Sequence, residues 1–303
     1  MENQVKTLAD AIRYFSDEQT CIDTVAGLRW PNGPECPACL MPRERQHWLK
    51  TQRRWQCRDC GRQYSVKLNT IFEDSAVPLT KWLPAMWLLA NCKNGVSSYE
   101  IARSIGVTQK SAWFMLHRIR ESMKNRSIRK LGSGGGPVEV DETFVGGKIS
   151  NKHLSKRPKI GPKRGAVGKA IVMGMLDRDT REVRSKVIPN VRRETLQGEI
   201  LKNIVGTGTV YTDAFPSYDD LYLQRFVHET VNHLEEYVRG EVHTNGIENF
   251  WSLLKRSLNG TYVAVEPFHL EAYADEQAFR YNNRKDKTDA DSRWQYRRFQ
   301  GRD

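Results

Sequence analysis

Apolar and polar residues follow two different periods along this chain, and the change comes near residue 137. Before it, apolar residues recur at helical spacing, which predicts helices over residues 80–92, from 97 to 106 and from 108 onward. After it, the alternation over residues 138–145 predicts a strand. The other elements predicted in this half are strands over 170–176, 183–188, 209–213 and 225–231, and helices over 193–205 and 245–258. The pattern therefore predicts a multidomain protein of mixed α+β and α/β class.

A glycine-rich break, LGSGGGP at residues 131–137, separates the two halves. Four glycines and a serine before a proline do not continue a helix, so we expect a linker or a sharp boundary there. With 303 residues, 39% of them hydrophobic, the chain is long enough for one large or two to three smaller domains with cores of their own. An aromatic content of 10% excludes disorder as the main state.

The charge balance points to a polyanionic partner. Lys and Arg number 48 against 36 Asp and Glu, a formal net charge of +12. No apolar window approaches the length of a membrane span, and the N-terminus has no hydrophobic run, so the sequence predicts a soluble, intracellular protein without a membrane partner. Residues 1–137 hold 21 basic and 12 acidic side chains, a balance of +9, which leaves only +3 for residues 138–303.

A basic loop is predicted between Glu142 and Asp177, a stretch with no acidic residue and with interleaved Gly and Pro. It is either a solvated charge run or an arm that binds phosphates, and its composition alone leaves both open. Its basic residues are Lys148, Lys152, Lys156, Arg157, Lys159, Lys163, Arg164 and Lys169.

Two Cys-x-x-Cys pairs, seventeen residues apart, predict a metal site. Each pair can present two thiolates from one tight turn, and four thiolates complete the tetrahedral shell of a structural Zn²⁺. Two disulfides or a redox pair are the alternatives, which an intracellular chain and the second pair disfavour. The predicted ligands are Cys36, Cys39, Cys57 and Cys60, whereas Cys21 and Cys92 are expected to be buried small residues.

The segment RRWQCRDCGRQYSV around the second pair alternates as a short ribbon of strands does. Such a ribbon can contact nucleic acid or another protein. Its arginines favour phosphate contact, and they are Arg53, Arg54, Arg58 and Arg62.

The helices predicted between residues 80 and 130 have the order of a helix-turn-helix. Pro84 is expected in the first turn of its helix, Ser97 and Glu100 form a capping box, and Gly106 ends the second helix. Thr108 can cap the third, whose apolar face is expected to hold Trp113, Leu116, Ile119 and Met123. An ordinary three-helix bundle is the alternative.

In a helix-turn-helix, the early residues of the last helix meet base edges. The candidates for base contact are Gln109, Lys110 and Ser111, and those for phosphate contact are Arg118, Arg120 and Lys124. The basic charge of this half favours DNA as the partner.

Three acidic residues of the second half can form one site. The predicted order there, three strands, a helix, a strand, a helix, a strand and a helix, is that of the RNase H-like fold. Asp141 lies inside the first strand, where a lone carboxylate is costly, and Asp213 ends the fourth. Glu248, 34 intervening residues later, is on the last helix, so the three carboxylates can converge on two Mg²⁺ ions.

Alternatives remain at the third position. Asn245 lies one turn before Glu248 on the same face and can offer its amide oxygen, and His243 is a further candidate. Lys255 is two turns beyond Glu248 on that face and can reach a DNA phosphate, with Arg256 beside it. Glu139 and Glu142 are expected to be structural.

Five motifs together resemble bacterial insertion-sequence transposases with an N-terminal zinc ribbon and an ISXO-like DDE domain. They are CPAC…WQCRDCGRQYSV, TIFEDSAVPLTKW, VEVDETFVGGK, VYTDAFPSY and HTNGIENFWSLLKRSLNGTY, and they span from about Cys36 to Tyr262. The resemblance implies strand cleavage and transfer dependent on Mg²⁺ or Mn²⁺, with Asp141 and Asp213 as the first two acids. Members of this group have Glu or Asn at the third position, and the Glu-x₆-Lys spacing favours Glu248 here.

The resemblance also implies double-stranded DNA as partner, a homodimer or larger assembly, and a cytoplasmic, nucleoid-associated location in a bacterium. An inactive DNA-binding regulator, an RNase H-like nuclease without strand transfer and a zinc-ribbon module that binds proteins are the alternatives. The expected parts are an N-terminal helical segment (1–30), the zinc ribbon (31–70), the helix-turn-helix region (71–130), the glycine-rich linker (131–137), the RNase H-like catalytic domain (138–285) and a basic tail (286–303).

Overall fold

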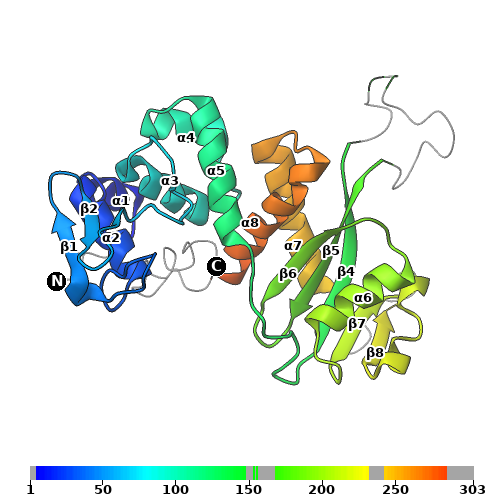
Figure 1. Cartoon of the computed structure of the whole chain (residues 1–303). Helices are drawn as coiled ribbons and strands as arrows, with labels where there is room; N and C mark the ends of the chain where they lie inside the picture. The colour runs from blue at the N-terminus through cyan, green and yellow to red at the C-terminus, as the bar shows by residue number, and fades with distance from the viewer. Residues whose placement is uncertain (1–4, 148–152, 154, 156–167, 232–241, 285–303) are drawn as a thin grey trace. The chain divides into compact units, whose positions relative to one another are not determined.

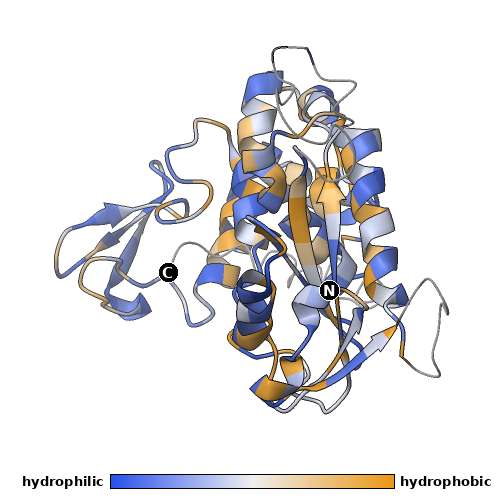
Figure 2. Cartoon of the chain, turned by 90° about the vertical axis from the view of Figure 1, so that its right-hand side faces the viewer, coloured by the Kyte–Doolittle hydropathy of each residue, from blue (hydrophilic) through white to orange (hydrophobic). Residues whose placement is uncertain are grey.

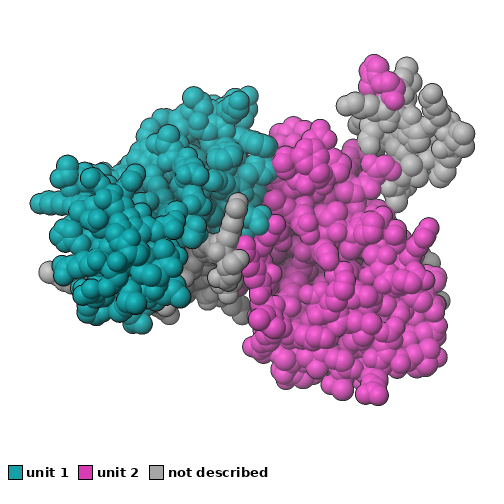
Figure 3. Space-filling view, in the orientation of Figure 1, with its two compact units in different colours: residues 1–123, 285–303 teal, residues 124–284 magenta. Residues whose placement is uncertain are grey.

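The computed structural model describes residues 5–147, 153, 155, 168–231 and 242–284. The chain divides into two compact units, one formed by residues 1–123 with 285–303 and the other by residues 124–284 (Figure 3). Both helices and strands occur in each unit, so the chain is a mixed α/β multidomain protein, as predicted (Figure 1). Within the described residues, no helix is long and apolar enough to cross a membrane.

The first unit combines helices with a small antiparallel sheet of order β1-β2-β3. Its strands are β1 (Gln46–Leu49), β2 (Arg54–Cys57) and β3 (Gln63–Tyr64), so the ribbon predicted around the second cysteine pair is present. Its helices are α1 (Leu8–Tyr14), α2 (Glu18–Arg29), α3 (Leu79–Asn91), α4 (Ser98–Ile105) and α5 (Gln109–Met123).

Local capping explains where these helices begin and end. The capping box of Ser97 and Glu100 starts α4, and Gly106, with a φ of 64°, ends it in the left-handed region. The carboxylate of Glu18 accepts hydrogen bonds from the first two N–H groups of α3. The position predicted for Pro84 is wrong: α3 begins at Leu79, so Pro84 lies in its second turn, where it removes one helical hydrogen bond.

The second unit contains a five-stranded sheet of order β6-β5-β4-β7-β8. Its strands are β4 (Val138–Val145), β5 (Ala170–Asp177), β6 (Val183–Ile188), β7 (Thr209–Asp213) and β8 (Val227–Val231). β4, β5 and β6 pair antiparallel, whereas β7 pairs parallel with both β4 and β8. The helices are α6 (Arg193–Asn203), α7 (Asn245–Arg256) and α8 (Leu270–Asn282).

The connection between β7 and β8 differs from the predicted order, which has a helix there. The structure has two short 3₁₀ turns instead, Pro216–Tyr218 and Leu221–Gln224. Pro216 lacks a backbone N–H, and Asp220 adopts a left-handed conformation between the turns, so a continuous α-helix cannot form. After α7, a π-helical turn covers Ser257–Tyr262, and a 3₁₀ turn over Pro267–His269 precedes α8.

Each face of this sheet buries its own apolar core. On one face, Val140 and Met175 pack with Leu196 and Ile200 of α6. On the other, Val172 and Leu176 are buried against α7 and α8 through side chains such as Phe250 and Leu254. Figure 2 shows apolar residues concentrated on the central strands. Strand β4 therefore lies between two helical layers, and along it Glu139 is fully buried whereas Asp141 and Glu142 are half-buried.

The glycine-rich segment 131–137 is tied to the turn between β5 and β6. The N–H of Gly132 donates to Asp177 and that of Gly136 to Asp179, both at 2.8 Å. Leu131 is buried in the core beside α6. These contacts give the segment a fixed place at the start of the second unit.

Candidate functional site

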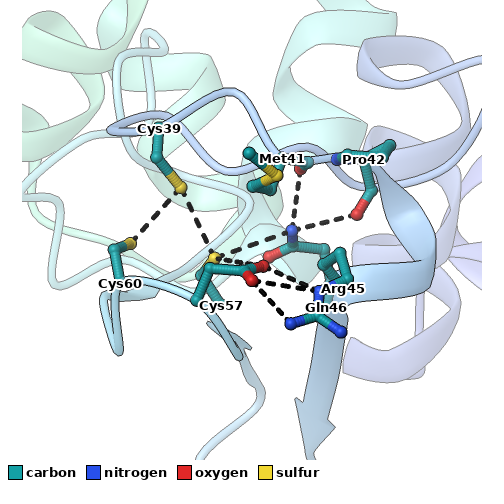
Figure 4. Close-up of polar contacts among 8 residues, drawn as sticks. Cys39, Met41, Pro42, Arg45, Gln46, Cys57 and Cys60 are labelled. Carbon is teal, nitrogen blue, oxygen red and sulfur yellow. Dashed lines mark hydrogen bonds and ion pairs between the residues drawn. The ribbon is translucent and has the colours of Figure 1, made fainter.

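The four predicted zinc ligands meet at the ribbon, and Figure 4 shows three of them, Cys39, Cys57 and Cys60. The Sγ atoms of Cys36 and Cys60 are 3.6 Å apart, those of Cys39 and Cys57 3.6 Å, and those of Cys39 and Cys60 3.5 Å. Zn–S bonds of about 2.3 Å in a tetrahedron put sulfurs roughly 3.8 Å apart, so the spacing fits this ion. Cys21 is buried, as expected, whereas Cys92 is only half-buried.

The ribbon backbone favours the thiolate form at Cys57, whereas at Cys39 a hydrogen bond from the Met41 backbone is outweighed by burial and the neighbouring thiols, which raise the pKa to about 12. A hydrogen bond from the backbone N–H of Cys60 lowers the pKa of Cys57 to about 6, despite the opposing effect of burial. Beside the cluster, Arg45 and Asp59 form an ion pair, and Gln46 donates to the carbonyl oxygen of Met41 at 2.8 Å (Figure 4). The ribbon is therefore arranged to hold a structural Zn²⁺.

The last helix of the predicted helix-turn-helix, α5, buries a different face from the one expected. Trp113 is 39% exposed, and Ala112 and Met115 take its place in the core with Leu116, Ile119 and Met123. The prediction that Arg120 contacts phosphates is wrong, because this residue is buried, with 1% of its surface exposed. The predicted face is displaced by one residue at the start of the helix, since the true apolar stripe begins at Ala112.

The candidate base-contacting residues lie at the beginning of α5 with different partners. Lys110 is exposed, the amide of Gln109 donates to Ser98 at 2.8 Å, and Ser111 bonds the capping Thr108. Arg118 is half-buried and donates to the backbone carbonyl of Glu73 at 2.6 Å. Lys110 is therefore the candidate whose charged group is most available to a ligand.

Asp141 and Asp213 lie on the adjacent strands β4 and β7. The parallel register pairs Glu139 with Tyr211, and two residues further along it Asp141 comes level with Asp213. Both are half-buried. Burial raises the pKa of Asp141 to about 6, and the charges of Asp213 and Glu248 act in the same direction. Asp141 therefore lies close enough to Asp213 and Glu248 for both charges to act on it.

Glu248 is exposed in the first turn of α7, where its carboxylate accepts a hydrogen bond from Thr244 at 3.0 Å. Asn245, Lys255 and Arg256 are exposed on the same helix. Among the described residues, the four cysteines are the only group of three or more His, Cys, Asp or Glu side chains whose ligand atoms lie close enough together to share an ion. Within the described residues, the ligand atoms of Asp141, Asp213 and Glu248 therefore do not meet at one point.

Two glutamates expected to be structural border this site. Glu139, fully buried, pairs with Arg178 at 2.7 Å and accepts the N–H of Ile247 at 2.9 Å. The Nδ1 atom of His243 lies 2.7 Å from the Arg178 guanidinium. No periodic signal reveals this pairing, since its partners are far apart in the sequence.

Glu142 lies beside Asp141 on β4 and accepts a hydrogen bond from Tyr218 at 2.5 Å. Burial raises its pKa to about 7, with Asp141 and Asp213 adding to the effect. The only sequence signal for a link between Glu142 and the site is its position directly after Asp141.

Most of the basic loop lies outside the described residues, as does the C-terminal basic tail. The DNA-binding candidates of that loop that fall there are Lys156, Arg157, Lys163 and Arg164.

Comparisons with known proteins cover both units. Residues 134–282 match the model of the ISXO2-like transposase domain, and residues 16–63 match that of the transposase zinc-ribbon domain. An uncharacterized protein in transposable element ISH50 of Halobacterium salinarum is 30% identical over 260 residues, 82% of this chain and 85% of its own. An uncharacterized transposase-like protein of Haemophilus influenzae is 36% identical over 107 residues, 35% of this chain and 86% of its own.

Among solved structures, one similar chain belongs to the simian T-cell lymphotropic virus intasome in complex with PP2A regulatory subunit B56 gamma. It covers 59% of this chain and 63% of its own at 14% identity, and its TM-score of 0.30 is too low for a conclusion. The two family matches and the relative that spans most of the chain agree with the cysteine cluster and the mixed sheet. The chain belongs to the insertion-sequence transposases that have an N-terminal zinc ribbon and an ISXO2-like transposase domain.

Proposed function

We propose that this transposase cleaves DNA at the ends of its insertion sequence and joins the freed ends to target DNA by metal-dependent phosphoryl transfer. The observation that carries the proposal is the parallel register of β4 and β7, which brings Asp141 level with Asp213. The charge of Glu248 reaches the same carboxylate. Family membership supplies the class of reaction.

We infer that residues 138–284 have an RNase H-like, DDE integrase-type fold. The sheet order β6-β5-β4-β7-β8, with three antiparallel strands followed by two parallel ones, supports this inference. The first strand is central, and the fourth lies beside it, so acids on these two strands approach each other without any long loop.

The donor set of the site fits Mg²⁺ or Mn²⁺, which prefer carboxylate oxygens. Asp141 and Asp213 would hold the metal, and Glu248 joins them when it leaves the hydroxyl of Thr244. When bound, such ions activate the attacking hydroxyl group and stabilise the leaving oxygen. Lys255, exposed two turns further along α7, binds a phosphate of the DNA and orients the scissile bond.

DNA binding is assigned to the first unit and to the basic residues of α7. Arg53, Arg54, Arg58 and Arg62 are all exposed on the ribbon. Lys110 is exposed at the beginning of α5, and Arg256 follows Lys255 at the end of α7. These cations contact the phosphates of the element ends, and two ends are paired by a homodimer or a larger assembly.

The test is a strand-cleavage and joining assay on DNA that contains the terminal inverted repeats, with Asp141→Asn and Asp213→Asn as variants. We expect both to lose cleavage and joining while they keep end binding. Asp219→Asn is the control, because Asp219 is exposed in the connection between β7 and β8, and we expect this variant to remain active. Cleavage without joined product identifies a nuclease, and DNA binding without cleavage identifies an inactive regulator. Normal cleavage by Asp141→Asn would contradict the assignment.

The third ligand is tested on α7 by the pair Glu248→Gln and Asn245→Ala. If Glu248 is the ligand, Glu248→Gln abolishes cleavage and Asn245→Ala keeps most of it. The opposite result assigns the position to Asn245. Sedimentation of the protein with end DNA measures the assembly, and a single chain on paired ends would contradict it.

A further inference from the structure

The indole of Trp251 connects α7 to Asp141. Its Nε1–H donates a hydrogen bond to Asp141 Oδ2 at 2.8 Å, and the side chain is only 4% exposed. The bond uses one of about four acceptor positions on the carboxylate, so the remaining ones stay available to a cation. Trp251 therefore orients Asp141 without occupying it.

Gly174 makes room for this ring. It is the residue directly opposite Asp141 in the antiparallel pairing of β4 and β5. A Cβ at Gly174 would lie 2.6 Å from the Trp251 ring and 2.8 Å from Ile247 Cδ1, closer than atoms can pack. Its backbone is not in the left-handed region, so the space taken by the indole, and not conformation, requires glycine here.

A second contact fixes the same helix on the same strand. Glu139 accepts the backbone N–H of Ile247 at 2.9 Å, four residues before Trp251. Four helical residues rise about 6 Å, and two strand residues, from Glu139 to Asp141, rise roughly 6.6 Å. Because the two spacings match, both bonds form together, and they set the position of Glu248 and Lys255 along β4.

We propose that Trp251, seated over Gly174, is a positioning residue that holds the Asp141 carboxylate in the orientation needed for the metal. The inference rests on the proposed function. A carboxylate that loses an oriented side-chain donor gains freedom to rotate about its terminal torsion, and loss of such outer partners typically costs 10–100-fold in metal affinity or activity.

The test compares Trp251→Phe with Trp82→Phe in the zinc-loaded full chain. Trp82 is the matched control because it is also buried and its Nε1–H donates to Ser75 at 3.0 Å in the other unit. Calorimetry measures Mn²⁺ binding without DNA, and the Mn²⁺ dependence of cleavage is measured separately. We expect Trp251→Phe to weaken Mn²⁺ binding about 10–100-fold and to regain cleavage at high Mn²⁺, with Trp82→Phe unchanged.

A second variant covers the case in which Trp251→Phe unfolds. Gly174→Ala keeps the indole but displaces it from Asp141, and we expect the same direction of change in Mn²⁺ binding. Wild-type Mn²⁺ binding by a folded Trp251→Phe or Gly174→Ala, while Asp141→Asn is inactive, overturns this inference alone. Wild-type activity of Asp141→Asn overturns the proposed function itself.

Discussion

The phenol O–H of Tyr218 donates a hydrogen bond of 2.5 Å to Glu142, the residue that follows Asp141 on β4. Tyr218 is fully buried in the core beside α6, so this contact brings a carboxyl group into an apolar layer. Burial, and then the negative charges of Asp141 and Asp213, raise the pKa of Glu142 to about 7 from an ordinary value of 4.5. The folded protein therefore binds a proton at Glu142 that the unfolded chain has already released above pH 4.5.

The raised pKa makes stability depend on pH. Glu142 contributes its full stability below pH 4.5, and this contribution is lost as pH rises toward 7 and beyond, because the folded state must then release the proton. Glu142→Gln keeps an acceptor for Tyr218 without the charge. We expect the variant to be more stable than wild type at pH 8 and similar to it at pH 5, by denaturant unfolding without added divalent metal. Glu271→Gln, exposed on α8, is the control, and an equal difference at both pH values would contradict the prediction.

The ion pair of Glu139 and Arg178 should matter more to stability than a surface pair of the same length. Its N–O distance is 2.7 Å with side chains 0% and 16% exposed, whereas Arg193 and Asp220, also 2.7 Å apart, are 46% and 41% exposed. Glu139→Gln leaves the Arg178 charge buried without its counter-charge, at a cost of roughly 3–5 kcal/mol in the free energy of unfolding. Asp220→Asn should cost about 0–1 kcal/mol. Denaturant unfolding measures both, and equal losses would contradict the argument.

Much of this fold follows from the sequence because strand periods are bounded by clear turn signals. The predicted bounds 138–145, 183–188 and 209–213 agree with β4, β6 and β7. The buried face of a helix is harder to predict, because adjacent apolar residues are compatible with two different faces. Trp113 was predicted on the buried face of α5 but is 39% exposed. Pro216 gives a local reason for the absence of a helix before β8, but the two 3₁₀ turns found there also depend on the packing of Tyr218 and Leu221 in the core, which no local pattern contains.

The candidate site divides in the same way. Residue type and spacing predicted the four cysteines, whose partners lie within one ribbon. The surroundings of Asp141 could not be predicted, since Trp251 lies 110 residues away in the sequence. The place of its ring depends on the absence of a side chain at Gly174. Likewise, Arg178 lies 39 residues from Glu139, in a turn whose direction only the folded sheet defines.

Zinc removal should affect the ribbon. Cys36→Ser leaves three thiolates, which no longer complete the tetrahedral shell, so we expect zinc content to fall from about one ion per chain toward zero. Strands β1 to β3 should then lose protection from proteolysis, because structural zinc contributes directly to folding. Metal analysis of the purified chain makes the measurement. Cys92→Ser, outside the cluster, should keep its zinc, and full zinc content in Cys36→Ser would disprove the four-cysteine site.

The glycine-rich segment should tolerate little change at Gly136. A Cβ there would lie 2.2 Å from Asp179 Oδ1, so alanine pushes away the carboxylate that accepts the Gly136 N–H. We expect Gly136→Ala to lower the free energy of unfolding by roughly 1–3 kcal/mol. Gly198→Ala, within α6 and with open space around it, should instead raise it by about 0.5–1 kcal/mol. Thermal or denaturant unfolding distinguishes the two, and a stabilised Gly136→Ala would show that the segment is not held by Asp179.

Salt dependence tests whether the charge of the first unit holds DNA. Each phosphate contact by a cation releases counterions, which contributes about 0.9 to the slope of log affinity against log salt concentration. Lys110 is exposed at the beginning of α5, and Lys110→Ala should therefore weaken binding to end DNA and reduce this slope by about 0.9. Lys202, which forms an ion pair with Glu199 on α6, is the control and should leave the slope unchanged when replaced by alanine. Fluorescence anisotropy at several salt concentrations gives both slopes. A wild-type slope near zero would mean that the basic residues of the ribbon and of α5 do not contact phosphates, and the DNA-binding role of this unit would have to be abandoned.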